Sequence, residues 1–437
     1  MHASGGRTRT ICVHWAKRTS DAPPAIDRNH NGMPDQVDDT IQTLRKVWRV
    51  EVGELGYRAP RRDRGPRAGQ GPNRGIDVYL ADIGAEGAFG YCTTDHRSPA
   101  QRRQRTAPAY CVLDNDFSKS QFHPPSVHGK NALEVTTAHE FFHAIQFAYD
   151  YSHRDQWLRE GTATWMEDEV YGGAHANYDF LDESPLGQPE VPLDTFGAPD
   201  TGENPEYGAW IFWRFLTEYL GTPDVVRAVW EQVGSGRSAW EATAQAVRRP
   251  AAYCLLQNHC GIPTLGDAVA EFQFWNLLSS NPAYWGFLSR KISVLRGTSW
   301  HSAFPQTYQE ADGYRHALPP LATDAEFDLA APRHSSTGTE ELRIDHMASR
   351  SAAILVESNG QFQVHLDTPP PGDGAQASIA IVPLQRPLKG SWYYFPLDDH
   401  GRAGGVFTGP AVVVLLFSNT SRTRDNQAYR FDAELVG

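Results

Sequence analysis

Hydrophobic positions in the first part of the chain alternate between strand and helix spacing. Short apolar runs with strand composition lie at 9–15, 76–80 and 110–113. Apolar residues at helical spacing lie at 36–55, 131–150 and 156–171. Strands mixed with long helices predict an α+β domain over residues 1–182.

The pattern changes after residue 182. A polar loop with five prolines runs from Glu183 to Pro205. Helical spacing rich in Trp and Phe then recurs at 207–220, 225–233, 239–247 and 265–278. This predicts a second, helical domain over residues 183–305.

Beyond residue 305 the pattern becomes one of short alternating runs. They lie at 341–347, 352–357, 361–366, 377–382, 392–396, 411–418 and 429–435. Turns rich in Gly, Pro, Asn and Asp separate these runs, as in an antiparallel β-sandwich. The sequence therefore predicts a sandwich domain over residues 306–437, and an α+β class for the whole chain.

Charge and hydropathy exclude two classes of partner. Fifty-two acidic and 40 basic side chains give a net charge of −12, which argues against general binding to nucleic acid or anionic membranes. No apolar run approaches 18 residues, so no membrane span is expected.

Five cysteines allow two disulfides and leave one thiol over. Cys92 and Cys111 follow tyrosines in strand-like runs and could pair across neighbouring strands, and Cys254 and Cys260 are spaced for a short loop. Cys12 would be left over. Two plausible bridges favour a secreted, extracellular protein over a cytosolic one with buried thiols.

The strongest chemical signal is the sequence His139-Glu140-Phe141-Phe142-His143 inside the predicted helix 131–150. Two histidines four residues apart on a helix point to one face, where both imidazoles can bind one zinc ion. Zinc lowers the pKa of a bound water towards 7, and Glu140 is placed to take its proton as general base.

A catalytic zinc needs a third protein ligand and an open position. Glu160 lies 17 residues after His143 on the next predicted helix, and Gly161, Thr162 and Ala163 follow it. Small residues allow two helices to pack closely, so Glu160 is the expected ligand.

HEFFHAIQFAYD followed by WLREGTATWMEDEVY resembles the gluzincin zinc metallopeptidases, whose best-known member is thermolysin. More narrowly, it resembles a little-characterised family of secreted bacterial proteins classed as metalloproteases. The resemblance covers roughly residues 130–172 and implies a zincin-type catalytic domain and a peptide or protein substrate. It matches His139 and His143 to the zinc histidines, Glu140 to the base and Glu160 to the glutamate ligand.

The sequence departs from thermolysin-like enzymes in two ways. The interval from His143 to Glu160 is somewhat shorter, and Thr164 stands where those enzymes have an aspartate that holds a zinc histidine. Glu167, two turns after Glu160 on the same face, could replace that aspartate. The alternative in which Glu167 is itself the ligand stays open.

Two further features complete the predicted cleft. Gluzincins commonly stabilise the developing oxyanion with a Tyr or His from their helical half, and Tyr207 is the candidate here. The competing interpretation is a packed aromatic in a Trp-rich and Phe-rich domain. Tyr110–Leu113, just before the metal helix, is the expected edge strand along which a peptide could add.

A calcium-like loop precedes the first predicted helix. Oxygen-bearing side chains recur at the spacing D-x-N-x-N-G, Gly32 permits the sharp turn, and Met33 would supply its backbone carbonyl. The expected ligands of a structural Ca²⁺ are Asp27, Asn29, Asn31, Met33, Asp35 and Asp38. The loop resembles those of dockerin-like modules. The alternative is an Asx-rich turn that only caps the helix.

The sequence supports two functional hypotheses. One is a secreted zinc-dependent peptidase that uses a zinc-activated water with Glu140 as base. The other is a catalytically inactive exported binding or adhesion protein on a zincin scaffold, with the calcium loop and the sandwich making the contacts. The presence together of His139, Glu140, His143 and Glu160 favours the enzyme, because a decayed site usually loses one of them.

Overall fold

The computed structural model shows an α+β protein whose contacts divide it into two compact units. The residues it describes are 11–62, 75–94, 104–122, 127–197, 204–252, 261–279, 324–330, 335–384 and 391–436. The first unit holds Met1–Asp179 and Pro223–Ala246, and the second holds Phe180–Thr222 and Val247–Gly437.

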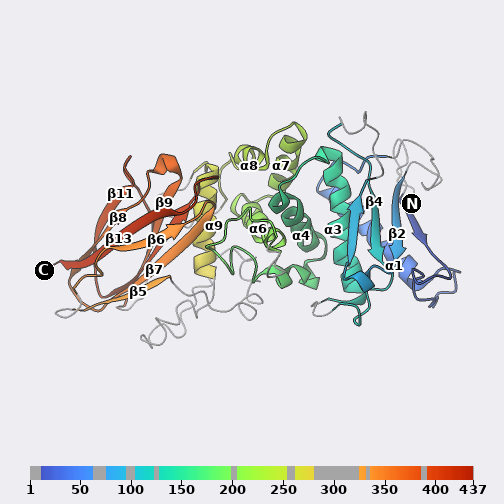
Figure 1. The fold of residues 1–437 in the computed structure, drawn as a ribbon, viewed down its shortest axis with the longest axis horizontal. Helices are drawn as coiled ribbons and strands as arrows, with labels where there is room; N and C mark the ends of the chain where they lie inside the picture. Colours follow the sequence, from blue (N-terminus) through green and yellow to red (C-terminus); the bar gives the residue numbers. More distant parts are fainter. Residues whose placement is uncertain are drawn as a thin grey trace. The chain divides into compact units, whose positions relative to one another are not determined.

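The first unit contains a four-stranded sheet (Figure 1). Its strands, in spatial order, are β1 (Ile11–Trp15), β2 (Ile76–Ala81), β4 (Tyr110–Asp114) and β3 (Gly90–Thr93). The first three run parallel, and β3 runs antiparallel to β4. The prediction that Tyr110–Leu113 is the edge strand is therefore wrong, because β3 pairs along its outer side. The strand-like run around Cys92 is β3, but its place at the edge of the sheet was not expected, because this strand is only four residues long and begins with a glycine.

The helix that carries His139 and His143 lies between this sheet and a second helix. α3 (Gly129–Asp150) packs on β3 and β4 and also on α1 (Asp35–Val47) and α4 (Gln156–Tyr171). Every α3 residue from 135 to 150 is buried, so the helix is covered around its whole circumference rather than on one stripe. α1 continues into a π-helical turn, Trp48–Glu54.

The first unit also contains the hairpin of α7 (Asp224–Gly234) and α8 (Ala239–Ala246), from a later part of the chain. α7 packs on α3, and the Trp230 indole donates a hydrogen bond of 3.2 Å to the Thr162 hydroxyl on α4. The predicted helical domain 183–305 is therefore divided. Its residues 223–246 belong to the first unit, and the rest belong to the second.

The second unit begins with helices α5 (Pro205–Gly208) and α6 (Trp210–Tyr219). α9 (Leu265–Ser279) packs on α6 and on two strands of the following sheet, β9 and β12. Short 3₁₀ turns lie at Gly84–Glu86, Gly172–Ala174, Ala176–Phe180 and Pro371–Asp373.

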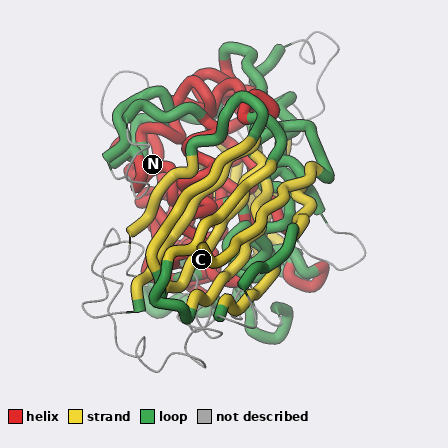
Figure 2. The backbone as a smooth tube through the Cα atoms, turned by 90° about the vertical axis from the view of Figure 1, so that its left-hand side faces the viewer, coloured by secondary structure: helices red, strands yellow, loops and turns green. Residues whose placement is uncertain are grey.

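Two sheets with one shared apolar core form the rest of this unit, and Figure 2 looks onto their strands. One sheet has the order β10 (Ser391–Phe395), β9 (Ala375–Pro383), β12 (Ala411–Asn419), β7 (Ala348–Val356) and β5 (Ala325–Leu329). The other has the order β11 (Arg402–Thr408), β8 (Gln361–Asp367), β13 (Gln427–Val436) and β6 (Glu340–Ile344). All pairings are antiparallel except that of β5 with β7. The predicted sandwich is therefore present, with β5 and β11 as additional strands.

Cys92 and Cys111 face each other in the register of β3 and β4 and form a disulfide, as the sequence suggested. Cys12 is not in a disulfide. The expected pair Cys254 and Cys260 lies outside the described residues.

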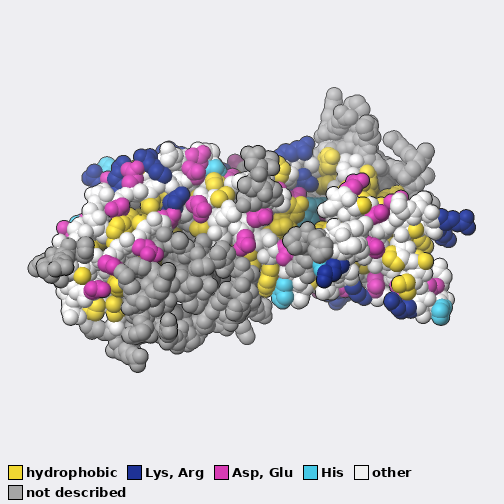
Figure 3. Space-filling model, turned by 60° about the horizontal axis from the view of Figure 1, so that its bottom comes forward, with side chains coloured by type: hydrophobic (Ala, Val, Ile, Leu, Met, Phe, Trp, Pro, Cys, Tyr) yellow, Lys and Arg dark blue, Asp and Glu magenta, His cyan; other side chains and the backbone are white. Residues whose placement is uncertain are grey.

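The described surface carries charged side chains of both signs. In the view of Figure 3, acidic and basic side chains are interspersed over the described surface. Among the described residues, none of the helices has the length and hydropathy needed to cross a bilayer.

Candidate metal centre

Three candidate ligands converge between α3 and α4. Because His139 and His143 lie one turn apart on α3, both imidazoles face Glu160 near the start of α4. Glu160 Oε2 lies 3.2 Å from His139 Nε2 and 3.1 Å from His143 Nε2. One ligand atom from each residue lies within 4.8 Å of the other two, and all three side chains are largely buried.

Hydrogen bonds on the far side of each imidazole fix its orientation. His139 Nδ1 lies 2.7 Å from Glu167 Oε1, and His143 Nδ1 lies 2.9 Å from Gln146 Oε1. A proton on each Nδ1 leaves the Nε2 lone pairs directed at Glu160, which is the tautomer that metal binding through Nε2 requires. Glu160 therefore lies among the ligand atoms, and Glu167 lies behind one of them.

Gln146 links this arrangement to α4 and α7. Its amide donates to the Arg159 carbonyl at 2.9 Å and to the Thr162 hydroxyl at 3.2 Å, and the same hydroxyl accepts from Trp230. We did not identify Gln146 from the sequence. Its spacing three residues after His143 on the same helix face could have indicated it.

Burial and charge act in opposite directions on this cluster. Burial alone would lower the pKa of His139, but hydrogen bonds with Glu160 and Glu167 raise it well above its ordinary value. Burial alone would raise the pKa of Glu160, but the charge of His143 and hydrogen bonds from both imidazoles hold it well below its ordinary value. A protonated His139 thus compensates the carboxylates where no metal is bound.

Glu140 points into the same region without a hydrogen-bond partner on Oε2 among the described residues. Burial raises its pKa, and the nearby charges of His143 and His139 oppose the shift. A buried carboxylate oxygen without a partner is costly unless water or a ligand reaches it. Two imidazole nitrogens and one carboxylate oxygen fit a zinc ion with a water in the fourth position. Glu140 Oε2 would lie beside that water.

The edge strand β3 passes directly over Glu140. A Cβ added at Gly90 would lie 2.8 Å from Thr136 Cγ2 and 2.9 Å from Glu140 Cγ, so only glycine permits this approach. The Cys92 sulfur lies 2.8 Å from the Glu140 carbonyl oxygen, a contact rather than a hydrogen bond because a disulfide sulfur carries no proton. β3 and its disulfide therefore border the predicted base.

A fourth carboxyl near this cluster was missed by sequence reasoning. Glu51, in the π-helical turn after α1, is fully buried, and neither oxygen has a hydrogen-bond partner among the described residues. Burial raises its pKa well above the ordinary value, while the charge of His139 opposes that rise. A π-turn often marks a functional site, but the sequence around Glu51 carries no motif that shows this.

The other predicted site residues lie elsewhere. Tyr207 lies on α5 in the second unit, where its ring stacks on Phe180 with centroids 5.0 Å apart. Its role as an electrophile stays a prediction.

The predicted calcium loop folds around its own side chains just before α1. Asp27 accepts hydrogen bonds from the backbone N–H groups of Asn31 and Gly32, and Asp38 accepts from the side-chain amides of Asn29 and Asn31. Gly32 has a φ of +84°, as the sharp turn requires.

Two further expected ligands of this loop are engaged within it. Asp35 accepts hydrogen bonds from the Arg28 backbone and guanidinium, and the Met33 N–H donates to Asn31. The predicted ligand residues are thus gathered in the loop and the first turn of α1, and calcium binding stays a prediction.

Comparison with known proteins adds little to this geometry. No protein-family model matches the sequence, and no curated protein matches it. Among solved structures, the chain is similar to a family GH115 4-O-methyl-α-glucuronidase with specificity for decorated arabinogalactans, at 8% identity and a TM-score of 0.16. The similarity covers 70% of this chain and 38% of the glucuronidase chain, and at this TM-score it carries no argument.

The geometry predicts different consequences for the two α4 carboxylates. With Glu160 as the third ligand, Glu160→Gln would remove a metal ligand, whereas Glu167→Gln would remove only the group that orients His139. We therefore expect Glu167→Gln to weaken zinc binding by about 10–100-fold and Glu160→Gln to weaken it more. Competition with a chromophoric zinc chelator measures both affinities.

The matched control is Glu169→Gln, the same substitution on another face of α4, which should leave zinc affinity unchanged. A greater loss in Glu167→Gln than in Glu160→Gln would make Glu167 the ligand and overturn the assignment.

Proposed function

We propose that this chain is a secreted zinc-dependent peptidase of the gluzincin type. The observation that carries the proposal is the meeting of His139 Nε2, His143 Nε2 and Glu160 Oε2 at a buried position beside Glu140, whose Oε2 has no hydrogen-bond partner among the described residues. The resemblance of HEFFH and its downstream glutamate helix to gluzincins supports the same reaction class.

The residues supply what a hydrolytic zinc site needs. When bound, zinc supplies Lewis acidity, which lowers the pKa of a coordinated water and polarises a carbonyl group. Glu140 takes a proton from the attacking water and returns it to the leaving amine. A carboxyl whose pKa is raised by burial suits this exchange, because it can hold the proton between the two steps.

An edge strand beside the base accounts for a peptide substrate. Among the described strands, β3 pairs only with β4, so its outer edge offers backbone groups to an extended peptide. Gly90 on this strand lies against Glu140, so a peptide added at β3 would bring its backbone close to the base. The exposed Tyr91 side chain would contact that peptide.

Tyr207 is the proposed electrophile for the developing oxyanion, on the strength of the gluzincin resemblance and its place at a helix start after the proline loop. An unchanged kcat in Tyr207→Phe would exclude it.

A structural calcium ion at the loop before α1 is part of the same proposal. The backbone and side-chain hydrogen bonds inside the loop already hold the oxygens of Asp27, Asn29, Asn31 and Asp38 near one another. A cation there would join β1 to the start of α1. Secretion suits both this ion and the Cys92–Cys111 disulfide, because extracellular media are oxidising and rich in calcium.

Replacement of the proposed base tests the reaction. We expect Glu140→Gln to lower kcat for casein or peptide cleavage by about 10²–10⁴-fold, because it removes proton transfer and leaves the three ligands in place. Zinc content, measured by atomic emission on the same preparation, should stay at the wild-type level. Glu134→Gln, on the same helix, is the matched control and should keep full activity.

Full activity in Glu140→Gln would exclude the residue as base. Bound zinc without hydrolysis of any peptide in the wild-type chain would instead favour the exported binding protein.

Calcium at the N-terminal loop predicts a shift in thermal stability. After chelation, calcium at about 100 times its Kd should raise the Tm by on the order of 5–10 °C. Asp27→Ala should abolish the shift, whereas His30→Asn should keep it, because position 30 is not a predicted ligand and Asn tolerates its positive φ. Differential scanning fluorimetry measures the Tm, and a Tm that ignores calcium in the wild-type chain argues for a simple Asx turn.

A further inference from the structure

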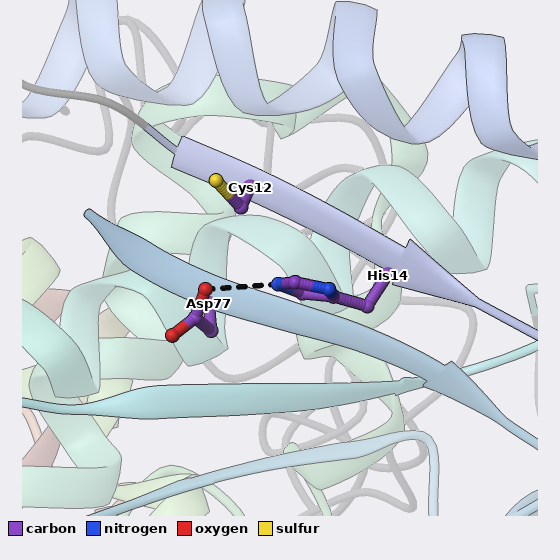
Figure 4. Close-up of side chains that lie close together, drawn as sticks. All are labelled: Cys12, His14 and Asp77. Atoms are coloured by element: carbon purple, nitrogen blue, oxygen red, sulfur yellow. Dashed lines mark hydrogen bonds and ion pairs between the residues drawn. The ribbon is translucent and has the colours of Figure 1, made fainter. Parts of the chain in front are cut away.

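A second cluster of metal-ligating side chains lies on the opposite face of the same sheet. Parallel pairing of β1 with β2 places Cys12 opposite Asp77 and His14 opposite Tyr79. Because residues i and i+2 of a strand share a face, the thiol, the imidazole and the carboxylate project to one side of the sheet (Figure 4). Cys111 is paired with Val78, the neighbour of Asp77, so its side chain projects from the other face of the sheet. Cys111 and its partner Cys92 contact Glu140 on α3, so the cluster lies on the face away from α3.

The three groups are already close enough to share an ion. His14 Nε2 lies 2.8 Å from Asp77 Oδ1, and one ligand atom from each of the three residues lies within 4.8 Å of the others. Bonds of 2.0–2.3 Å in tetrahedral geometry place ligand atoms about 3.5 Å apart. Small side-chain rotations therefore suffice to admit a cation.

The surroundings hold the cluster in place and leave it accessible. The Asp77 side chain is only 4% exposed, whereas the His14 side chain is 30% exposed and Cys12 is half-buried. His14 stacks on Tyr79 with ring centroids 4.7 Å apart, which fixes the plane of the imidazole. The carboxylate is thus an inner anchor, and a cation can approach from the side of the thiol and the imidazole.

The arrangement fits a chelate better than a catalytic relay. A Cys–His–Asp relay needs the thiol on one imidazole nitrogen and the carboxylate on the other. Here Asp77 holds Nε2, and Figure 4 shows the Cys12 sulfur towards that same end of the ring. Sulfur, nitrogen and oxygen donors that meet at one point suit a borderline divalent cation of the zinc type.

We propose that Cys12, His14 and Asp77 form a second metal site for a thiophilic divalent cation of the zinc type, with the fourth position filled by water. The site needs no contribution from the centre on α3 and α4, and it does not depend on the proposed peptidase activity.

Cobalt distinguishes the two sites because only this one contains sulfur. A chain that carries His143→Ala, Cys254→Ser and Cys260→Ser lacks one ligand of the first centre and leaves Cys12 as the only cysteine besides Cys92 and Cys111. We expect one Co²⁺ per chain with a thiolate-to-cobalt charge-transfer band in the near ultraviolet. Cys12→Ser should abolish the band, and Asp77→Asn or His14→Phe should raise the Kd for Co²⁺ at least about tenfold.

Tyr79→Phe is the matched control, since it keeps the ring that stacks on His14 and should leave the Kd for Co²⁺ unchanged. Absence of the band, or a band that persists in Cys12→Ser, overturns the proposal. So does a Kd that ignores both Asp77→Asn and His14→Phe.

A second measurement uses the wild-type chain and does not rely on the stability of the variants. Zn²⁺ should slow alkylation of Cys12 by iodoacetamide at least about tenfold, because a metal-bound thiolate is a poor nucleophile. Peptide mass spectrometry reads this residue separately from the other cysteines. An alkylation rate that zinc does not change overturns the proposal as well.

Discussion

The first unit is organised around the cost of burying several acidic side chains between two helices. Glu140, Glu160 and Glu167 are all buried or nearly so, and two imidazoles are their main polar neighbours. Carboxylates removed from water are strongly unfavourable unless protons or cations compensate them. The pKa directions show both remedies: burial raises the pKa of Glu140 and Glu167, while Glu160 stays ionised against the imidazoles. A divalent cation compensates the same charges without a proton, which is why this cluster fits a metal centre better than a structural ion pair.

The rest of the first unit buries this cluster and holds its side chains in place. α3 is buried by the sheet, α1, α4 and α7, and the side chains of both of its histidines are only 8% exposed. Gln146, Thr162 and Trp230 form a chain of hydrogen bonds that ties three helices together behind His143. Fixed outer partners of this kind hold ligands in one geometry, and α7 supplies one of them although it is distant in sequence.

Patterns along the sequence predicted the features that depend on residues close together in the chain. The helix spacing of His139 and His143, the small residues after Glu160, and the main helices and sandwich strands could all be read from periodicity. The run around Cys92 was recognised as strand-like but not as the edge of the sheet, and β5 and β11 were not expected at all. A four-residue strand with a glycine and a strand with two glycines have no clear alternation. Glu51, the approach at Gly90 and the transfer of α7 and α8 to the first unit depend on contacts between distant segments. Periodicity along the chain carries no information about such contacts.

The difference between local patterns and long-range contacts also explains why the sequence indicated the cluster of His139, His143 and Glu160 but not that of Cys12, His14 and Asp77. On α3, a spacing of four residues brings two ligands to one face, and the third follows on the next helix. On β1, a spacing of two residues does the same for Cys12 and His14, but the third member, Asp77, is 63 residues from His14 and meets it only through the register of β1 and β2. The two sets also differ in softness, since only the second contains sulfur. One sheet therefore separates a cluster of nitrogen and oxygen donors on its helix-covered face from a cluster that contains sulfur on its other face, and the donor types on each face follow from the periodicity of the element that supplies them.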